Sequence, residues 1–166
     1  MNAATEFDLG PLTWVKGEID LALTRAVEAL VQHELNGDAT QLRFCRTHVH
    51  QVNGALSIVG LDGVTQVTES LEALLSALEE QRLQFTAEIS ITLTQAIAAI
   101  RKYLDDLVAG EPNQPLRLFL VYSVLATARG LSSCNPADLF FPDLSLRPPK
   151  RSVPVAPLSA EQLHTL

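Results

Sequence analysis

Apolar residues recur every three or four positions along five segments of this chain, which is the period of a helix with one buried face. The pattern is most regular in residues 12–34, which end at Asn36-Gly37-Asp38, and in residues 40–61. The stripe of the second segment is Leu42, Cys45, Val49, Val52, Leu56 and Val59. This alternation of three and four is the spacing found at the seams of helix bundles. We expect both segments to be helices.

Three further segments show the same period. We expect them to span residues 64–81, 86–109 and 115–130. Asp62-Gly63 marks a turn before the third segment, and Thr86 is a suitable N-cap for the fourth. Gly110, followed by Pro112, ends the fourth segment.

The short connections predict the architecture. Short loops make consecutive helices antiparallel neighbours, so the first four segments should form an all-α, up-down-up-down four-helix bundle. The fifth helix should pack on its side or end. We divide the chain into an N-terminal extension (1–11), the bundle with its fifth helix (12–141) and a linker (142–166), which holds five of the nine prolines. Such a linker is typical of a module cut from a longer protein. Just before it, Phe140 and Phe141 are candidates to dock onto the bundle.

Composition narrows the function. Hydrophobic residues make up 47% of the chain but aromatic residues only 5%, which favours helix packing over a β-sandwich. A net charge of -7 argues against nucleic-acid binding, and there is no polybasic segment for a membrane surface. We found no secretory signal and no apolar run of membrane-spanning length. Cys45 and Cys134 are far apart and are expected to be buried thiols. These features favour a cytoplasmic protein.

The second segment carries the residues that suggest chemistry. With about 100° between successive residues, His50 falls about 130° from the centre of the apolar stripe, so it should be exposed on the flank of the bundle. His48 lies nearer the stripe and should be half-buried. Gly54 lies one turn beyond His50 and costs about 0.5–1 kcal/mol relative to alanine in a helix. It either lets a partner protein approach His50 or lets a neighbouring helix pack closely.

An exposed histidine suits phosphoryl transfer. One imidazole nitrogen is nucleophilic near neutral pH while the other can be fixed by a hydrogen bond. A carboxylate on the adjacent third helix could make that bond, and Glu69 and Glu72 are the candidates. Glu72 follows Leu71 at the edge of the apolar stripe and can face the second helix. The alternative is that both are solvated surface carboxylates.

Other activities find little support. His48 and His50 are two residues apart, so they point in different directions on a helix, and no third ligand has suitable spacing for a metal site. The chain has no Gly-rich phosphate loop, so it is not a kinase by itself. We expect Trp14 to be a core or staple residue. In the fifth helix, Leu120 and its neighbours Phe119 and Tyr122 add apolar surface that could bind another module or a second copy.

The stretch from His50 to Gly60, His-Gln-Val-Asn-Gly-Ala-Leu-Ser-Ile-Val-Gly, resembles the signature of histidine phosphotransfer (HPt) domains. The residues that fall on it in register are His50, Val52, Gly54, Ala55 and Gly60. The segment Leu71-Glu-Ala-Leu-Leu75 is similar to the third helix of CheA-type HPt domains, which implies that Glu72 hydrogen-bonds the phosphorylated imidazole. Where the signature has a lysine that stabilises the phosphoryl group, this chain has Asn53.

A second resemblance covers residues 8–147. The segments that carry it are Leu12-Thr-Trp-Val-Lys-Gly-Glu-Ile-Asp20, Gln41-Leu-Arg-Phe-Cys45, His50-Gln-Val and Asp138-Leu-Phe-Phe-Pro-Asp-Leu144. They are similar to the N-terminal region of ChpA/PilL-type chemotaxis hybrid kinases, which control type IV pili and twitching motility. FimL-type scaffold proteins share this region but lack the phosphoacceptor histidine, whereas this chain has His50.

Two functions follow from these resemblances. In the first, His50 is the phosphoacceptor of a phosphorelay, and the partners are a CheY-like response-regulator receiver domain and the kinase core of a parent protein. The receiver would supply the magnesium ion, and the bundle would need no cofactor. In the second, the bundle is a scaffold that binds response regulators or pilus regulatory proteins without transferring phosphate. Either function places it in the cytoplasm, with polar localisation through a larger chemosensory assembly.

Overall fold

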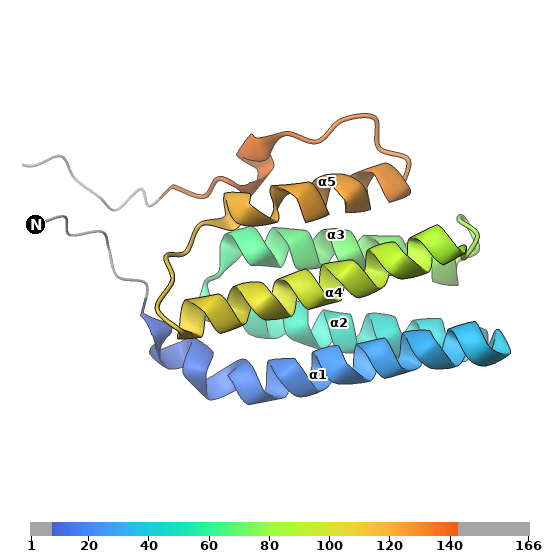
Figure 1. The fold of residues 1–166 in the computed structure, drawn as a ribbon, viewed down its shortest axis with the longest axis horizontal. Coiled ribbons are helices and arrows are strands. Elements are labelled where there is room, and N and C mark those ends of the chain that lie inside the picture. The colour runs from blue at the N-terminus through green and yellow to red at the C-terminus, as the bar shows by residue number, and fades with distance from the viewer. Residues whose placement is uncertain (1–7, 143–166) are drawn as a thin grey trace, which may run out of the picture.

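The computed structural model describes residues 8–142, and these residues are organised entirely around helices (Figure 1). The long helices are α1 (Leu9–Asn36), α2 (Ala39–Val59), α3 (Asp62–Glu79), α4 (Ala87–Val108) and α5 (Phe119–Ala128). Two single-turn 3-10 helices, η1 (Pro115–Leu118) and η2 (Pro136–Leu139), flank α5. The predicted linker, residues 142–166, lies outside the described residues except for Pro142.

Helices α1 to α4 form the predicted bundle. The helix α2 packs against α1 and α3, and α4 packs against α1 and α3, while α5 contacts α3 and α4. In Figure 1, α5 therefore lies on the side of the bundle away from α1 and α2. The fold-class prediction, an antiparallel four-helix bundle with an added C-terminal helix, is confirmed. The outer surface of α1 and α2 has no helix on it among the described residues.

Most helix ends were visible in the sequence. Thr86 caps α4 as predicted, and its side chain accepts a hydrogen bond from the Ile89 N–H. Gly37 ends α1 in the left-handed region, at φ 67°. Gly60 ends α2 in the same left-handed region, at φ 81°, slightly before the predicted end at residue 61.

The turn before α3 is one correction. We expected it at Asp62-Gly63, but these residues form the first turn of α3, and the chain reverses at Gly60-Leu61. Gly63 is instead a close-packing site, because a Cβ atom added there would lie 2.2 Å from Pro115. Its missing side chain lets the start of η1 rest against the start of α3.

Trp14 and the two phenylalanines are further corrections. Trp14 is 89% exposed, because it lies two residues after the buried Leu12 and so points to the opposite side of α1. Phe140 and Phe141 are also exposed, and Leu139 is the residue of this segment that enters the core. Cys45 is buried as expected, and burial raises the pKa of its thiol to about 12, whereas Cys134 is only half-buried.

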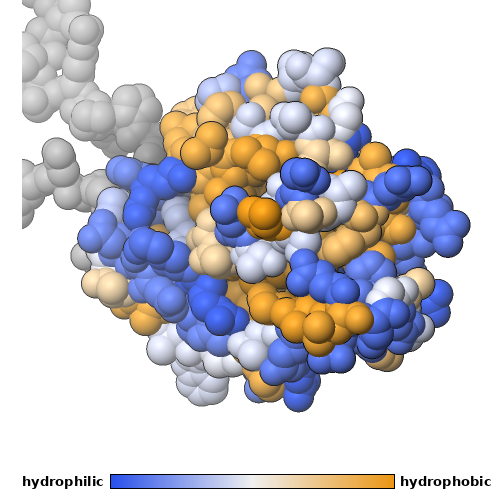
Figure 2. Space-filling model, turned by 45° about the vertical axis from the view of Figure 1, so that its right-hand side comes forward, coloured by the Kyte–Doolittle hydropathy of each residue, from blue (hydrophilic) through white to orange (hydrophobic). Residues whose placement is uncertain are grey.

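The fifth helix leaves apolar surface uncovered, as its composition predicted. The upper part of the molecule in Figure 2, the side on which α5 lies in Figure 1, carries a broad apolar area. The large apolar side chains exposed on α5 and its flanking segments are Leu116, Leu120, Val124, Leu131, Phe140 and Phe141. None of the described helices is long and apolar enough to cross a membrane.

The contact between Gly63 and Pro115 gives a stability prediction. We expect Gly63→Ala to lower the free energy of unfolding by about 1–3 kcal/mol, because the new methyl group overlaps the proline ring. The matched control is Gly54→Ala, where nothing lies within 4 Å of the added atom. That helical substitution should leave stability unchanged or raise it by about 0.5–1 kcal/mol. Urea denaturation measures both, and equal effects would contradict the packing role of Gly63.

Candidate functional site

The site centres on a histidine in the middle of α2. The His50 side chain is 72% exposed, on the flank that faces α3. Its Nδ1 atom lies 2.9 Å from Oε1 of Glu72, which α3 contributes from the facing turn. Glu72 is only 19% exposed, so the carboxylate lies at the seam between the helices while the imidazole projects beyond it.

This hydrogen bond selects one tautomer of the imidazole. An ionised carboxylate can only accept hydrogen bonds, so the proton of a neutral His50 ring belongs on Nδ1. Nε2 then carries the free lone pair and lies on the side of the ring away from Glu72. The arrangement presents a nucleophilic nitrogen to solvent, with a carboxylate behind it to stabilise positive charge on the ring.

Asn53 binds the same carboxylate. It lies three residues after His50, and its Nδ2 donates to Oε2 of Glu72 over 3.4 Å. The two oxygens of Glu72 are therefore held by two side chains of α2. Asn53 Oδ1 is buried and has no hydrogen-bond partner among the described residues. Asn53 is half-buried and neutral, so it orients Glu72 without adding charge at the site.

Gly54 leaves open space beside the imidazole. Nothing lies within 4 Å of the position that its Cβ would occupy, so the glycine is not there for packing against a neighbouring helix. His50, Gly54 and Ile58 follow one another at intervals of four residues and form one row on the outer surface of α2. Ile58 is 86% exposed, so the row ends on a large apolar side chain.

The other residues singled out from the sequence do not join His50. His48 is half-buried, as expected, and its Nδ1 lies 3.1 Å from Oε1 of Gln51. Glu69 is exposed on α3 and makes no hydrogen bond to His50. Within residues 8–142, no three His, Cys, Asp or Glu side chains are grouped so that they could hold a metal ion.

A second carboxylate at the same seam was missed in the sequence. Glu79 lies seven residues, or two turns, after Glu72 and accepts from the Nε atoms of Arg46 at 2.5 Å and Arg43 at 3.1 Å. The hydrogen bond from Arg46, together with Arg43, holds the pKa of Glu79 below its usual value despite partial burial. The spacing in the sequence indicated this second group, because Arg46 and Arg43 lie one and two turns before His50 and Glu79 lies two turns after Glu72.

The fold and this site define a helical bundle that presents an exposed histidine oriented by a carboxylate from the next helix. The Hpt domain family matches residues 12–108, more than half of the chain. The chain therefore belongs to the Hpt domain family, whose members carry out phosphotransfer in two-component systems and pair with response-regulator receiver domains. Searches of curated proteins and of solved structures gave no match.

The bond between His50 and Glu72 predicts a spectroscopic effect. We expect Glu72→Gln to lower the Nδ1–H population of neutral His50, because a neutral amide orients the ring less strongly than a carboxylate. Nitrogen-15 shifts of the imidazole measure the tautomer ratio. Glu69→Gln is the control, since it removes a carboxylate from the same helix. Equal tautomer ratios in the wild type and Glu72→Gln would contradict an orienting role for Glu72.

Proposed function

We propose that His50 is the phosphoacceptor of this Hpt domain and exchanges a phosphoryl group with the aspartate of a receiver domain. The supporting observation is the bond from Nδ1 to Glu72, which leaves Nε2 unprotonated and facing solvent. Exposure of the imidazole and the absence of a side chain at Gly54 give a second protein access to that nitrogen.

The reaction needs few groups from this chain. The Nε2 lone pair attacks the phosphorus atom of an aspartyl phosphate, and the N–P bond forms as the P–O bond breaks. The electron pair of that bond leaves with the aspartate carboxylate. The ring gains positive charge as Nε2 becomes bonded, and Glu72 stabilises it through the Nδ1–H. The reverse transfer follows the same path.

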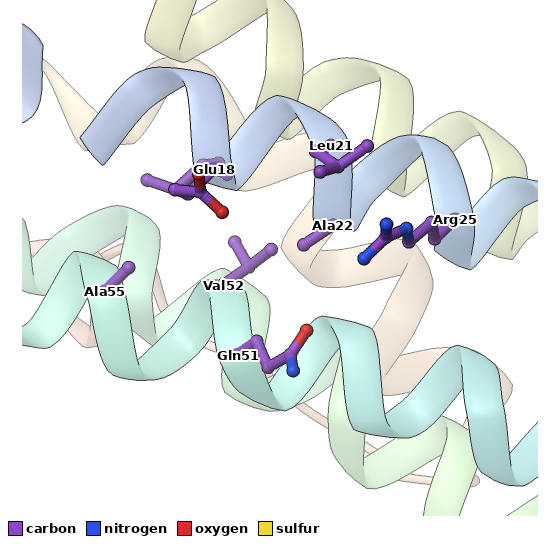
Figure 3. A pocket seen from close by; sticks show the side chains of 8 residues that line it. Glu18, Leu21, Ala22, Arg25, Gln51, Val52 and Ala55 are labelled. Atoms are coloured by element: carbon purple, nitrogen blue, oxygen red, sulfur yellow. The ribbon is translucent and has the colours of Figure 1, made fainter. Parts of the chain in front are cut away.

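The receiver would dock on the outer surface of α1 and α2. A shallow cavity of about 180 Å³ lies between these helices, and Figure 3 shows side chains of both helices converging on it. Its wall includes Glu18 and Leu21 from α1 and Ala55 from α2. Trp14 lies one turn before Glu18 on α1, and Ile58 lies about one turn after Ala55 on α2. Both are highly exposed apolar side chains, and they extend the groove. An exposed apolar area with a polar rim is typical of a protein interface.

Magnesium belongs to the partner in this proposal. The charge of a transferring phosphoryl group is commonly neutralised by a divalent cation held by carboxylates. Receiver domains would bring that cation in their acidic pocket, and the groups assigned here to His50 and Glu72 act without it.

A scaffold function is the second candidate, and Asn53 is the observation that favours it. The residue is neutral and its amide is engaged by Glu72, so it offers no cation to a phosphoryl group. A domain of this kind could bind a receiver through α1 and α2 while transferring phosphate slowly or not at all. Receiver binding without phosphotransfer would support this function.

We further propose a particular signalling system for this Hpt domain. The resemblance of residues 8–147 to ChpA/PilL-type kinases supports a chemosensory system that controls type IV pili and twitching motility. The kinase core of a longer parent protein would then be the phosphodonor. This assignment has its own test, because it predicts a motility defect rather than only a biochemical one.

The central prediction concerns His50→Gln. The wild-type domain, incubated with a phosphorylated receiver, should take up an acid-labile, base-stable label, and the variant should take up none, because glutamine has no nucleophilic nitrogen. His48→Gln is the control and should be labelled normally, since His48 is turned toward Gln51. A labelled His50→Gln domain, or an unlabelled wild type, would overturn the phosphoacceptor assignment. In cells, His50→Gln should abolish twitching, and normal twitching would contradict the type IV pilus assignment.

The docking surface gives a separate prediction. We expect Ile58→Glu to weaken receiver binding by about tenfold, because it replaces a highly exposed apolar side chain that extends the groove with a charged one. The control is Ile91→Glu on α4, which changes another exposed isoleucine that does not line the groove between α1 and α2. Titration calorimetry with the receiver compares them. Equal effects of the two substitutions would show that the receiver docks elsewhere.

A further inference from the structure

A phosphorylated His50 would need a cation that its immediate neighbours do not supply. The phosphoryl group adds about two negative charges and three acceptor oxygens at neutral pH. Glu72, which holds Nδ1, is itself an anion, and Asn53 is neutral and already bonded to Glu72. A cation supplied by the domain itself must therefore be a lysine or arginine from outside this group of three residues.

Two arginines precede His50 on the same flank of α2. Arg46 lies one turn and about 6 Å before it along the helix axis, and Arg43 lies two turns and about 10 Å before it. Helix side chains lean toward the N-terminus, so the imidazole of His50 leans over the turn that contains Arg46. The reach of an arginine side chain covers the separation of about 5–6 Å between Cβ atoms at this spacing.

The same cluster holds a surplus of positive charge. Arg46 and Arg43 share one carboxylate, that of Glu79, so one of the two guanidinium charges is not compensated there. Arg46 bonds Glu79 through Nε, and its side chain remains 35% exposed. The guanidinium therefore has further donors that can reach a new acceptor.

We propose that Arg46 is the phosphoryl-binding cation of this domain: its guanidinium is held by Glu79 in the resting state and donates to the phosphoryl oxygens on His50 after transfer. The proposal rests on the function assigned to His50. A guanidinium fits the task because its planar donors match phosphate oxygens in pairs. Glu79 holds Arg46 in the resting state and competes with the phosphoryl oxygens for its guanidinium.

The test uses phosphoramidate as the donor, because a small molecule separates the chemistry from receiver docking. Nε2 of His50 attacks its phosphorus atom, the P–N bond breaks, and the nitrogen leaves as ammonia after taking up a proton. We expect Arg46→Gln to lower the labelling rate by about tenfold and to shorten the phosphohistidine half-life, since a charge-assisted hydrogen bond is lost. Arg46→Lys keeps the charge and should recover most of the rate.

Three matched variants separate this role from others. Arg43→Gln removes the other arginine that pairs with Glu79. Arg25→Gln removes an arginine of α1 that lines the groove between α1 and α2. Both should stay within about twofold of the wild type, as expected for distant exposed charges. Glu79→Gln removes the competing acceptor from Arg46 and should raise the rate. A structural role for the ion pair would instead make Glu79→Gln as harmful as Arg46→Gln.

The outcomes distinguish this inference from the function on which it rests. A wild-type domain that takes no label from phosphoramidate or a phosphorylated receiver contradicts both. A wild type labelled on His50 together with an Arg46→Gln variant of equal rate overturns the inference alone, as does a loss seen only in Arg25→Gln. Thermal unfolding of Arg46→Gln checks its fold, and the opposite signs expected for Glu79→Gln and Arg46→Gln test the role even where Arg46→Gln is less stable.

Discussion

The site depends on the antiparallel register of α2 and α3. The turn at Gly60-Leu61 sets this register, and the buried side chains on both helices maintain it. A shift of α3 by one residue would rotate Glu72 by about 100° and remove its carboxylate from the imidazole. His50 can therefore project into solvent and still have a fixed orientation, because the partner that fixes it is anchored in the seam. The apolar core is in this sense part of the chemistry, although none of its atoms reacts.

The two carboxylates of α3 divide the polar edge of the seam into two units. Glu72 accepts hydrogen bonds from His50 and Asn53, and Glu79 accepts them from Arg46 and Arg43. The seven-residue spacing places both carboxylates on one face of α3, and in each unit the two α2 side chains are three residues apart. The first unit contains no lysine or arginine, while the second has two arginines for one carboxylate. In the proposed mechanism, Arg46 is the donor that passes from the second unit to the phosphoryl group on His50.

Periodicity predicted the bundle and the exposed position of His50. It left both Glu69 and Glu72 as partners of the imidazole, and the family resemblance pointed to Glu72. Helix period fixes which side of α2 faces the core, and the same wheel places His50 on the flank. It failed where a single position can be read in two ways. Gly63 looked like a turn residue, but its conformation is helical and its role is to make room for Pro115. Trp14 looked like core because tryptophan is large and apolar, yet the residues around it on the wheel are exposed. Glu79 was missed because its partners depend on the relative position of two helices.

The proposed competition between Glu79 and the phosphoryl group for Arg46 limits how strongly the phosphorylated state of His50 is stabilised. A relay histidine must pass its phosphoryl group on. A cation that binds this group too strongly would stabilise the phosphohistidine and slow the onward transfer. When the guanidinium leaves Glu79 to bind the phosphoryl oxygens, one charge-assisted contact replaces another, so the net stabilisation is a difference between two similar terms. A lysine free in solvent next to the histidine would face no such competitor. The resting ion pair thus keeps the phosphorylated state accessible in both directions.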